Sequence, residues 1–178
     1  MTFEQAMGDV RALDLADIGL AAELDLGEAG DILFRQDGRD LVTYQRSWAR
    51  PSDIGDEMVE YLERWRGIVR AGGTALGAFS GGRLVGIAVL RLDLEPGVAQ
   101  LDGLYVDRAH RRAGVAETLS RRLEAVARQA DASSMYVSAT PTPSAVGFYR
   151  SLGYEPTDSP NPRLLALEPD DIHLRKAL

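Results

Sequence analysis

One segment constrains this chain more than any other: an apolar stretch, a basic turn containing glycine and an amphipathic stretch follow one another directly. Residues 98–106 are typical of a strand, and residues 116–130 have helical apolar spacing. Unpaired N–H groups at a helix N-terminus attract anions, and Gly114 allows a close backbone approach. The turn adds the basic side chains Arg108, His110, Arg111 and Arg112. The segment therefore predicts a site for a phosphorylated ligand.

Composition narrows the function classes. A formal net charge of −7 argues against a non-specific nucleic-acid binder, which needs excess Lys and Arg, and weakly favours a cationic partner. The chain has no cysteine, which excludes disulfides, a thiolate nucleophile and cysteine metal sites. His110 and His173 are the only histidines, so we expect no metal site. We interpret His173 as a structural residue whose ring is satisfied by neighbours.

The chain shows no sign of membrane targeting. No apolar run is long enough to span a bilayer, and residues 1–5 lack the basic start and apolar core of a signal peptide. We expect a cytoplasmic protein that binds neither membranes nor nucleic acid.

Periodicity and turn signals predict one domain, residues 1–178, of mixed α/β class. A hairpin around Asp37-Gly38 joins residues 32–35 to 41–44. Helices are expected over 16–26, 56–70, 116–130 and 142–153, the last with Thr142 as N-cap. Strands are expected over 10–13, 74–79, 84–92, 98–106, 134–139, 154–157, 163–167 and 172–178.

Two motifs resemble those of the GNAT superfamily of N-acetyltransferases. Arg111-Arg112-Ala113-Gly114-Val115-Ala116 is similar to the family signature R/Q-x-x-G-x-G/A, and residues 145–154 are similar to A-x-x-F-Y-x-x-x-G-F/Y. A helix and a strand separate them, as in the family. Two positions depart from the common pattern: Thr142 stands where many members carry Asn, and Ala116 where many carry Gly.

The resemblance implies a GNAT fold with a mixed, mostly antiparallel central sheet flanked by helices, and acetyl-CoA as co-substrate without a metal. Residues 74–157 would bind acetyl-CoA, residues 1–73 would form the acceptor side, and residues 158–178 would add C-terminal strands. The cofactor-binding residues implied are Leu104, Tyr105, Val106, Arg111, Arg112, Ala113, Gly114, Val115, Ala116 and Thr142. The backbone of residues 98–106 would pair with the pantetheine arm and polarise the thioester carbonyl.

Two side chains are candidates for catalysis. By resemblance, Tyr149 protonates the departing CoA thiolate, since a phenol is a neutral donor at working pH. Alternation along a strand places residues 100, 102 and 104 on one face. Gln100 cannot accept a proton usefully, so Asp102 is the candidate base, with a role in orienting the substrate ammonium as an equal alternative. Gly103 marks a bulge or a close backbone approach.

The expected activity is transfer of acetyl to an amine of a small molecule or peptide, by direct attack in a ternary complex. A non-catalytic module that binds or senses acyl-CoA is the alternative. Whether the hairpin at 31–50 acts as a lid or supports a homodimer stays open. Tyr44, Trp48, Tyr61 and Trp65 either line an acceptor pocket or belong to the core, and we prefer the core for the last two.

Overall fold

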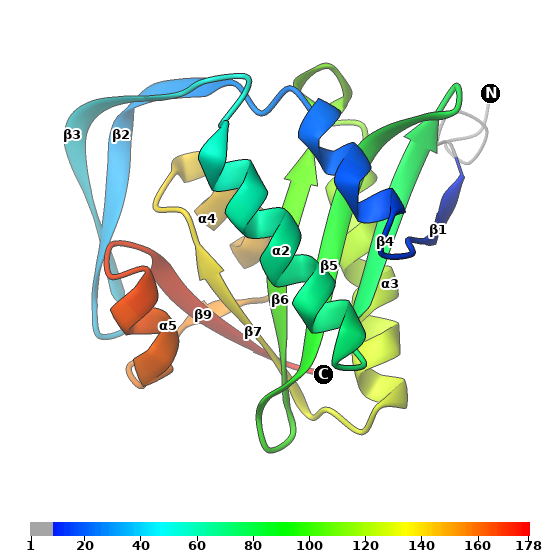
Figure 1. Cartoon of the computed structure of the whole chain (residues 1–178). Helices are drawn as coiled ribbons and strands as arrows, with labels where there is room; N and C mark the ends of the chain where they lie inside the picture. Colours follow the sequence, from blue (N-terminus) through cyan, green and yellow to red (C-terminus); the bar gives the residue numbers. More distant parts are fainter. Residues whose placement is uncertain (1–8) are drawn as a thin grey trace.

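The computed structural model describes residues 9–178, so the expectation about a signal peptide lies outside the described part. A seven-stranded sheet forms the centre (Figure 1). Its order is β1 (Val10–Ala12), β4 (Thr74–Ser80), β5 (Arg83–Glu95), β6 (Val98–Val106), β7 (Ser134–Ala139), β9 (Ile172–Ala177) and β8 (Glu155–Pro156). Among the strand pairs of this sheet within residues 9–178, only β6–β7 is parallel. The mixed, mostly antiparallel sheet is therefore confirmed.

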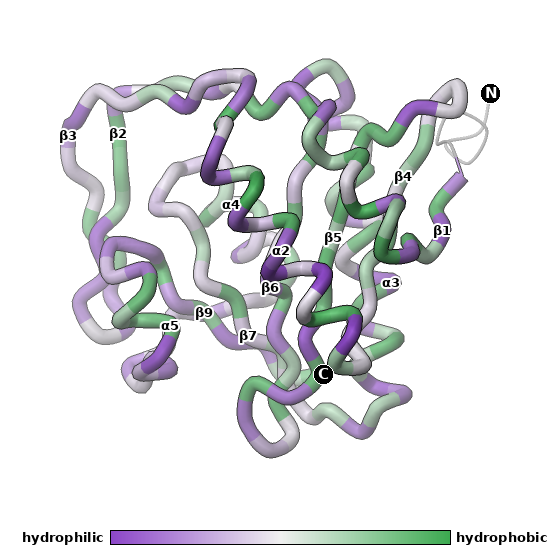
Figure 2. The backbone as a smooth tube through the Cα atoms, in the orientation of Figure 1, coloured by the Kyte–Doolittle hydropathy of each residue, from purple (hydrophilic) through white to green (hydrophobic). Residues whose placement is uncertain are grey.

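Helices cover both faces of the sheet. On one face, α3 (Val115–Gln129) and α4 (Pro143–Ser151) bury the larger apolar cluster, which includes Leu119, Leu123 and Val146. On the other face, α2 (Asp56–Arg70) and the 3₁₀ helix η1 (Asp17–Glu23) bury a second cluster around Trp65. The central strand β5 is apolar along most of its length (Figure 2), because helices cover it on both sides.

A separate hairpin, β2 (Glu28–Asp37) with β3 (Asp40–Arg50), stands beside the main sheet (Figure 1). The Phe34 amide donates to the Pro141 carbonyl at 2.8 Å. Gln36 Nε2 donates to the Thr157 carbonyl at 2.8 Å, and its Oε1 accepts from the His173 amide at 2.7 Å. The predicted hairpin is confirmed, is longer than expected, and is fastened to β9 and to the segment before α4.

Two expected elements are wrong. Residues 163–167 were expected as a strand but belong to helix α5 (Pro162–Leu167), because Asn161 Oδ1 accepts from the amides of Arg163 and Leu164 and thus caps a helix. The helix expected over 16–26 is the shorter 3₁₀ helix η1. Its chain turns extended at Leu24, and the Leu26 amide donates to the Ser52 carbonyl instead of continuing a helix.

A bulge in β6 changes the predicted alternation of its side chains. Val89 pairs with Gly103 and Leu90 with Leu101, so Asp102 is the extra residue. Asp102 faces α2, whereas Leu104 packs into the cluster under α3. The expectation that residues 100, 102 and 104 share one face is therefore wrong for Leu104. The bulge predicted near Gly103 is confirmed.

No helix in the described range, 9–178, is long and apolar enough to cross a membrane.

Candidate active site

The strands β6 and β7 separate partway along their length. They pair only from Val98 to Gln100 with Ser134 to Tyr136, and β6 continues to Val106 without β7 beside it. An unpaired strand edge offers backbone donors and acceptors to an extended ligand. The predicted contact positions Leu104, Tyr105 and Val106 all lie in this unpaired part.

The predicted phosphate loop follows β6 directly and has an unusual backbone. Gly114 caps α3 in the left-handed conformation, with φ of 80° and no side-chain cap. Arg112 is also left-handed, with φ of 62°, which is uncommon for a residue other than glycine. Turns of this kind point successive N–H groups into a concavity that suits anions. The loop and the start of α3 thus have the geometry of a phosphate cradle.

The basic side chains of this loop divide into two groups. Arg111 points inward, where Nε donates to the Val106 carbonyl at 3.2 Å and a terminal nitrogen donates to the Gly27 carbonyl at 3.1 Å. His110 Nδ1 lies 3.2 Å from Asp107 Oδ1. Arg108 and Arg112 belong to exposed residues. Arg111 therefore fixes the loop, and Arg108 and Arg112 are its exposed arginines.

Asp107 anchors the base of the loop and was missed by the sequence reasoning. Burial alone would raise its pKa, but hydrogen bonds from the Asp25 and Ala109 amides and from the His110 ring lower the pKa. A short polar residue directly after a strand and before a turn was the available signal.

Tyr149 lies on α4 with 8% of its surface exposed. Its ring packs edge-on against Phe148 and Tyr154, with centroids at 5.3 and 5.6 Å. Burial, with Tyr105 and Asp171 nearby, raises the pKa of Tyr149 well above its usual range. The phenol is therefore protonated at neutral pH and is a donor. Thr142 Oγ1 caps this helix by accepting from the Ala145 amide at 3.3 Å.

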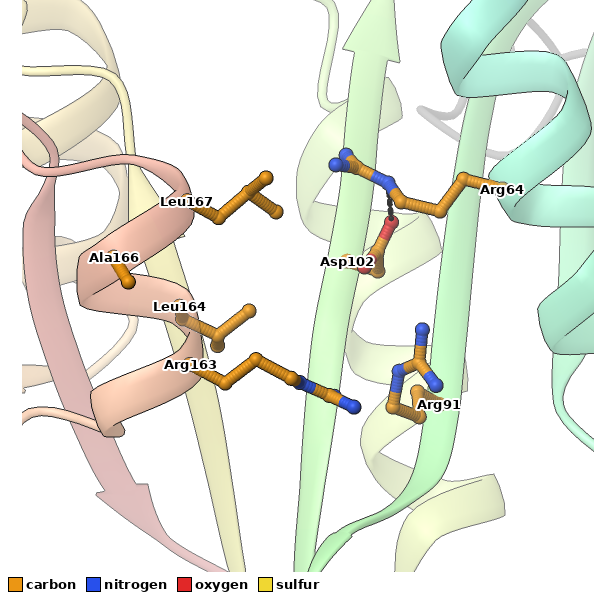
Figure 3. A pocket seen from close by; sticks show the side chains of 7 residues that line it. All are labelled: Arg64, Arg91, Asp102, Arg163, Leu164, Ala166 and Leu167. Carbon is orange, nitrogen blue, oxygen red and sulfur yellow. Dashed lines mark ion pairs between the residues drawn. The ribbon is translucent and has the colours of Figure 1, made fainter.

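Asp102 is held in an ion pair. Its side chain is 4% exposed, and Oδ2 lies 3.0 Å from Arg64 Nε on α2 (Figure 3), at an angle too bent for a hydrogen bond. Gln100 Nε2 donates to its other oxygen at 3.2 Å. Arg64 also lies 3.7 Å from Glu168. Burial alone would lower the pKa of Arg64, but these two carboxylates raise it.

Asp171 precedes β9 and was not singled out from the sequence. It accepts a hydrogen bond from Ser138 Oγ on β7 at 3.3 Å. Burial, followed by the charge of Glu168, raises the pKa of Asp171 to about 7. The charge of Asp171 is also one of the causes of the raised pKa of Tyr149. A proton acceptor with the pKa of Asp171 suits general-base catalysis at neutral pH.

Of the four aromatic residues considered above, Tyr61 and Trp65 belong to the core, as preferred. Trp65 is fully buried and stacks on Tyr61, with ring centroids 5.6 Å apart. Tyr44 is exposed, and Trp48 Nε1 donates to the Ile32 carbonyl within the hairpin. His173 is buried, and its Nδ1 lies 2.7 Å from the Tyr136 hydroxyl. Its Nε2 is buried without a hydrogen-bond partner within residues 9–178, so the expected satisfaction of the ring is met at one nitrogen and not at the other. Burial lowers the pKa of His173.

Within residues 9–178, no group of three or more His, Cys, Asp or Glu side chains is arranged to hold a metal ion.

The comparison with known protein families decides what this arrangement is. The model of the acetyltransferase (GNAT) family matches residues 41–154, well over half of the chain. This chain belongs to the GNAT acetyltransferase family. It is an acyl-CoA-dependent acetyltransferase, as both sequence motifs predicted. No curated protein matches the sequence closely enough to name a relative.

Solved structures share the fold over nearly the whole chain. Nourseothricin acetyltransferase is 16% identical with a TM-score of 0.70, covering 97% of this chain and 98% of its own. A Bacillus anthracis protein provisionally named a streptothricin acetyltransferase, solved with acetyl coenzyme A, is 16% identical with a TM-score of 0.72, covering 96% of each chain. PaiA N-acetyltransferase of Thermoplasma acidophilum, solved with coenzyme A, is 14% identical with a TM-score of 0.64, covering 96% and 98%. At these identities the likeness concerns the fold.

Proposed function

We propose that this acetyltransferase moves the acetyl group of acetyl-CoA to an amine of a small molecule, by direct attack within a ternary complex. The observation that carries the proposal is the separation of β6 from β7, with the phosphate-type loop directly after β6. Tyr149 lies on α4, the helix that follows β7 along the chain. Similar folds solved with acetyl coenzyme A or coenzyme A support the choice of co-substrate.

The loop is the proposed pyrophosphate site. The backbone of Arg111, Arg112, Ala113, Gly114, Val115 and Ala116 would bind the pyrophosphate oxygens, with the Arg112 guanidinium adding charge. The pantetheine arm would pair with the backbone of Leu104, Tyr105 and Val106 along the free edge of β6. The Thr142 hydroxyl already contacts the Ala145 amide and Ser144, so its proposed contribution is mainly to fix α4.

The chemical step needs one proton donor and one proton acceptor. The amine nitrogen attacks the thioester carbon, a C–N bond forms, and the C–S bond breaks. Tyr149 gives its hydroxyl proton to the departing thiolate, while the amine loses its proton to a carboxylate. The products are the N-acetylated amine and CoA.

Two carboxylates divide the remaining roles. Protonation of Asp102 would cost it the ion pair with Arg64, so of its two expected roles we propose the orienting one. Asp171 is the proposed base, because its pKa of about 7 leaves it able both to accept and to release a proton near neutral pH.

The test is release of free thiol from acetyl-CoA in the presence of a panel of amines, with the acetylated product identified by mass. Turnover with at least one amine supports the proposal. Tight binding of acetyl-CoA, measured by calorimetry, without turnover across the panel would favour the acyl-CoA sensor instead. A chain that shows no binding and no thermal shift with acetyl-CoA would overturn both.

A further inference from the structure

A cavity of about 440 Å³ opens between α5 and the β5–β6–α2 wall of the molecule (Figure 3). Its floor includes Asp102, the residue that stands beside the proposed reaction site. Leu164, Ala166 and Leu167 of α5 line one side, and Figure 3 shows the two leucine side chains directed from α5 toward the opposite wall. The volume suits a small molecule rather than a folded partner.

Three arginines line this cavity and only one acid does. Arg64 is paired with Asp102 and Glu168. Arg91 on β5 and Arg163 on α5 have no ion pair and no side-chain hydrogen bond within residues 9–178. Arg91 Nε is buried and unpartnered. A buried donor without a partner is costly, so it marks a place where a ligand atom would gain most.

The two unpaired guanidinium groups approach the cavity from opposite sides. Figure 3 shows the Arg163 side chain extending from α5 toward the strands that carry Arg91 and Asp102. Like charges that share one cavity repel unless an anion lies between them. A planar carboxylate matches the fork of a guanidinium and can bind two of them at once.

On the basis of the proposed acetyl transfer, we infer that the acceptor is a small amine that also carries a carboxylate, which binds between Arg91 and Arg163. Its apolar part packs on Leu164 and Leu167, and its ammonium faces Asp102. A phosphate fits less well, because the second negative charge of a phosphate would face the buried Asp102 carboxylate. A polyamine fits least, since its charges would meet the unpaired arginines.

This inference differs from the weak expectation of a cationic partner, which came from the net charge of −7. That charge is the sum over the whole chain, whereas three arginines and one aspartate line the cavity. It also draws specificity from residues 158–178, expected as C-terminal strands, because α5 supplies Arg163 and both leucines.

The test compares three amines that differ only in the anionic group: leucine, leucinamide and isopentylamine. We expect kcat/KM at least tenfold higher for leucine than for the other two. In Arg91→Gln and in Arg163→Gln, the preference for leucine should fall to within about twofold because KM for leucine rises. KM for leucinamide and the affinity for acetyl-CoA should stay the same. Arg163→Lys should restore part of the preference, and Arg121→Gln, on the outer face of α3, should leave it intact.

A preference for leucinamide or spermidine over leucine, or an unchanged preference in both Gln variants, would overturn the inference. Phosphoethanolamine is included as a further amine to separate recognition of a carboxylate from recognition of a phosphate. Better turnover of phosphoethanolamine than of leucine would also contradict the inference. Binding of 4-methylpentanoate, which has no amine, is measured separately by calorimetry. Loss of that binding in Arg91→Gln supports the anion site even where no amine is turned over, so the failure of acetyl transfer and the failure of this site are distinguishable.

Discussion

Arg64 Nε lies 3.0 Å from Asp102 Oδ2 and thereby connects α2 to the bulge in β6 (Figure 3). The bulge turns the Asp102 carboxylate toward α2 and out of the strand's regular alternation. The pair thus forms part of the wall of the acceptor cavity beside the open edge of β6. Because Asp102 is held by Arg64, Asp171 is the acid that we propose for proton transfer.

Replacing Asp102 with Asn tests its proposed orienting role. The variant keeps the shape but loses the charge, so we expect KM for the amine to rise about tenfold while the pH dependence of kcat/KM keeps its form. Arg64 would retain Glu168 as a partner, which limits the loss in unfolding free energy to about 1–3 kcal/mol. Steady-state kinetics between pH 6 and 9 and urea unfolding measure both effects. Disappearance of the pH-dependent limb would instead identify Asp102 as the base.

Asp171→Asn should remove the proposed proton acceptor. Burial and the charges of Glu168 and Asp170 raise the pKa of Asp171 to about 7, against the hydrogen bond from Ser138 and the charge of Arg50, which lower it. In the wild type, kcat/KM should rise with pH through about 7 as the carboxylate becomes ionised. The variant should lose that limb and about 10²-fold in kcat/KM at pH 8.

Titration of the substrate amine affects the wild type and Asp171→Asn equally. The difference between their pH profiles of kcat/KM therefore reports the ionisation of Asp171. Asp170→Asn, at the exposed neighbouring residue, is the control and should keep the limb.

The raised pKa of Asp171 also has a consequence for stability. The folded state holds the proton more tightly than the unfolded chain, so this contribution is present below about pH 4 and is lost as pH rises through about 7. Asp171→Asn should therefore gain unfolding free energy relative to wild type between pH 5 and pH 8. Urea unfolding at the two pH values measures the change, and a relative loss over this range would contradict the assignment.

Tyr149→Phe should lower kcat by 10²-fold or more, because the thiolate would leave without its proton donor. The affinity for acetyl-CoA, measured by calorimetry, should stay within about twofold. Tyr154→Phe is a matched control, since Tyr154 is fully buried and its hydroxyl has no hydrogen-bond partner within residues 9–178. It should keep full activity. Equal losses in both variants would point to packing around α4 as the cause.

Elements with strong local signals were predictable from the sequence. β6 and β7 have the predicted bounds, because apolar runs there end at clear turn residues. Helix α5 was mistaken for a strand because Arg-Leu-Leu-Ala-Leu is too short to show a period. Asn161-Pro162 before it carries the same capping signal as Thr142-Pro143 before α4, and that signal would have identified it.

The residues of the site also differ in whether the sequence alone predicts them. The loop at 111–116 and Tyr149 lie in contiguous motifs, so the family resemblance reaches them. Asp171 and Arg91 lie in no such motif, because nothing in the neighbouring sequence distinguishes them from charged residues on the surface. Their significance depends on burial and on neighbours contributed by β7, α2 and α5, which only the folded chain brings together.

Gly103→Ala tests the close packing of α2 on β6. A Cβ at Gly103 would lie 2.8 Å from the indole of Trp65, which is fully buried. We expect a loss of about 1–3 kcal/mol in unfolding free energy and, since Arg64 lies on the same helix, a higher KM for the amine. Gly67→Ala on α2 is the matched control: a Cβ there meets nothing within 4 Å, so helix propensity should raise stability by about 0.5–1 kcal/mol. Urea unfolding of both variants measures the contrast, and a Gly103→Ala protein as stable as wild type would show that α2 can move away from β6 without cost.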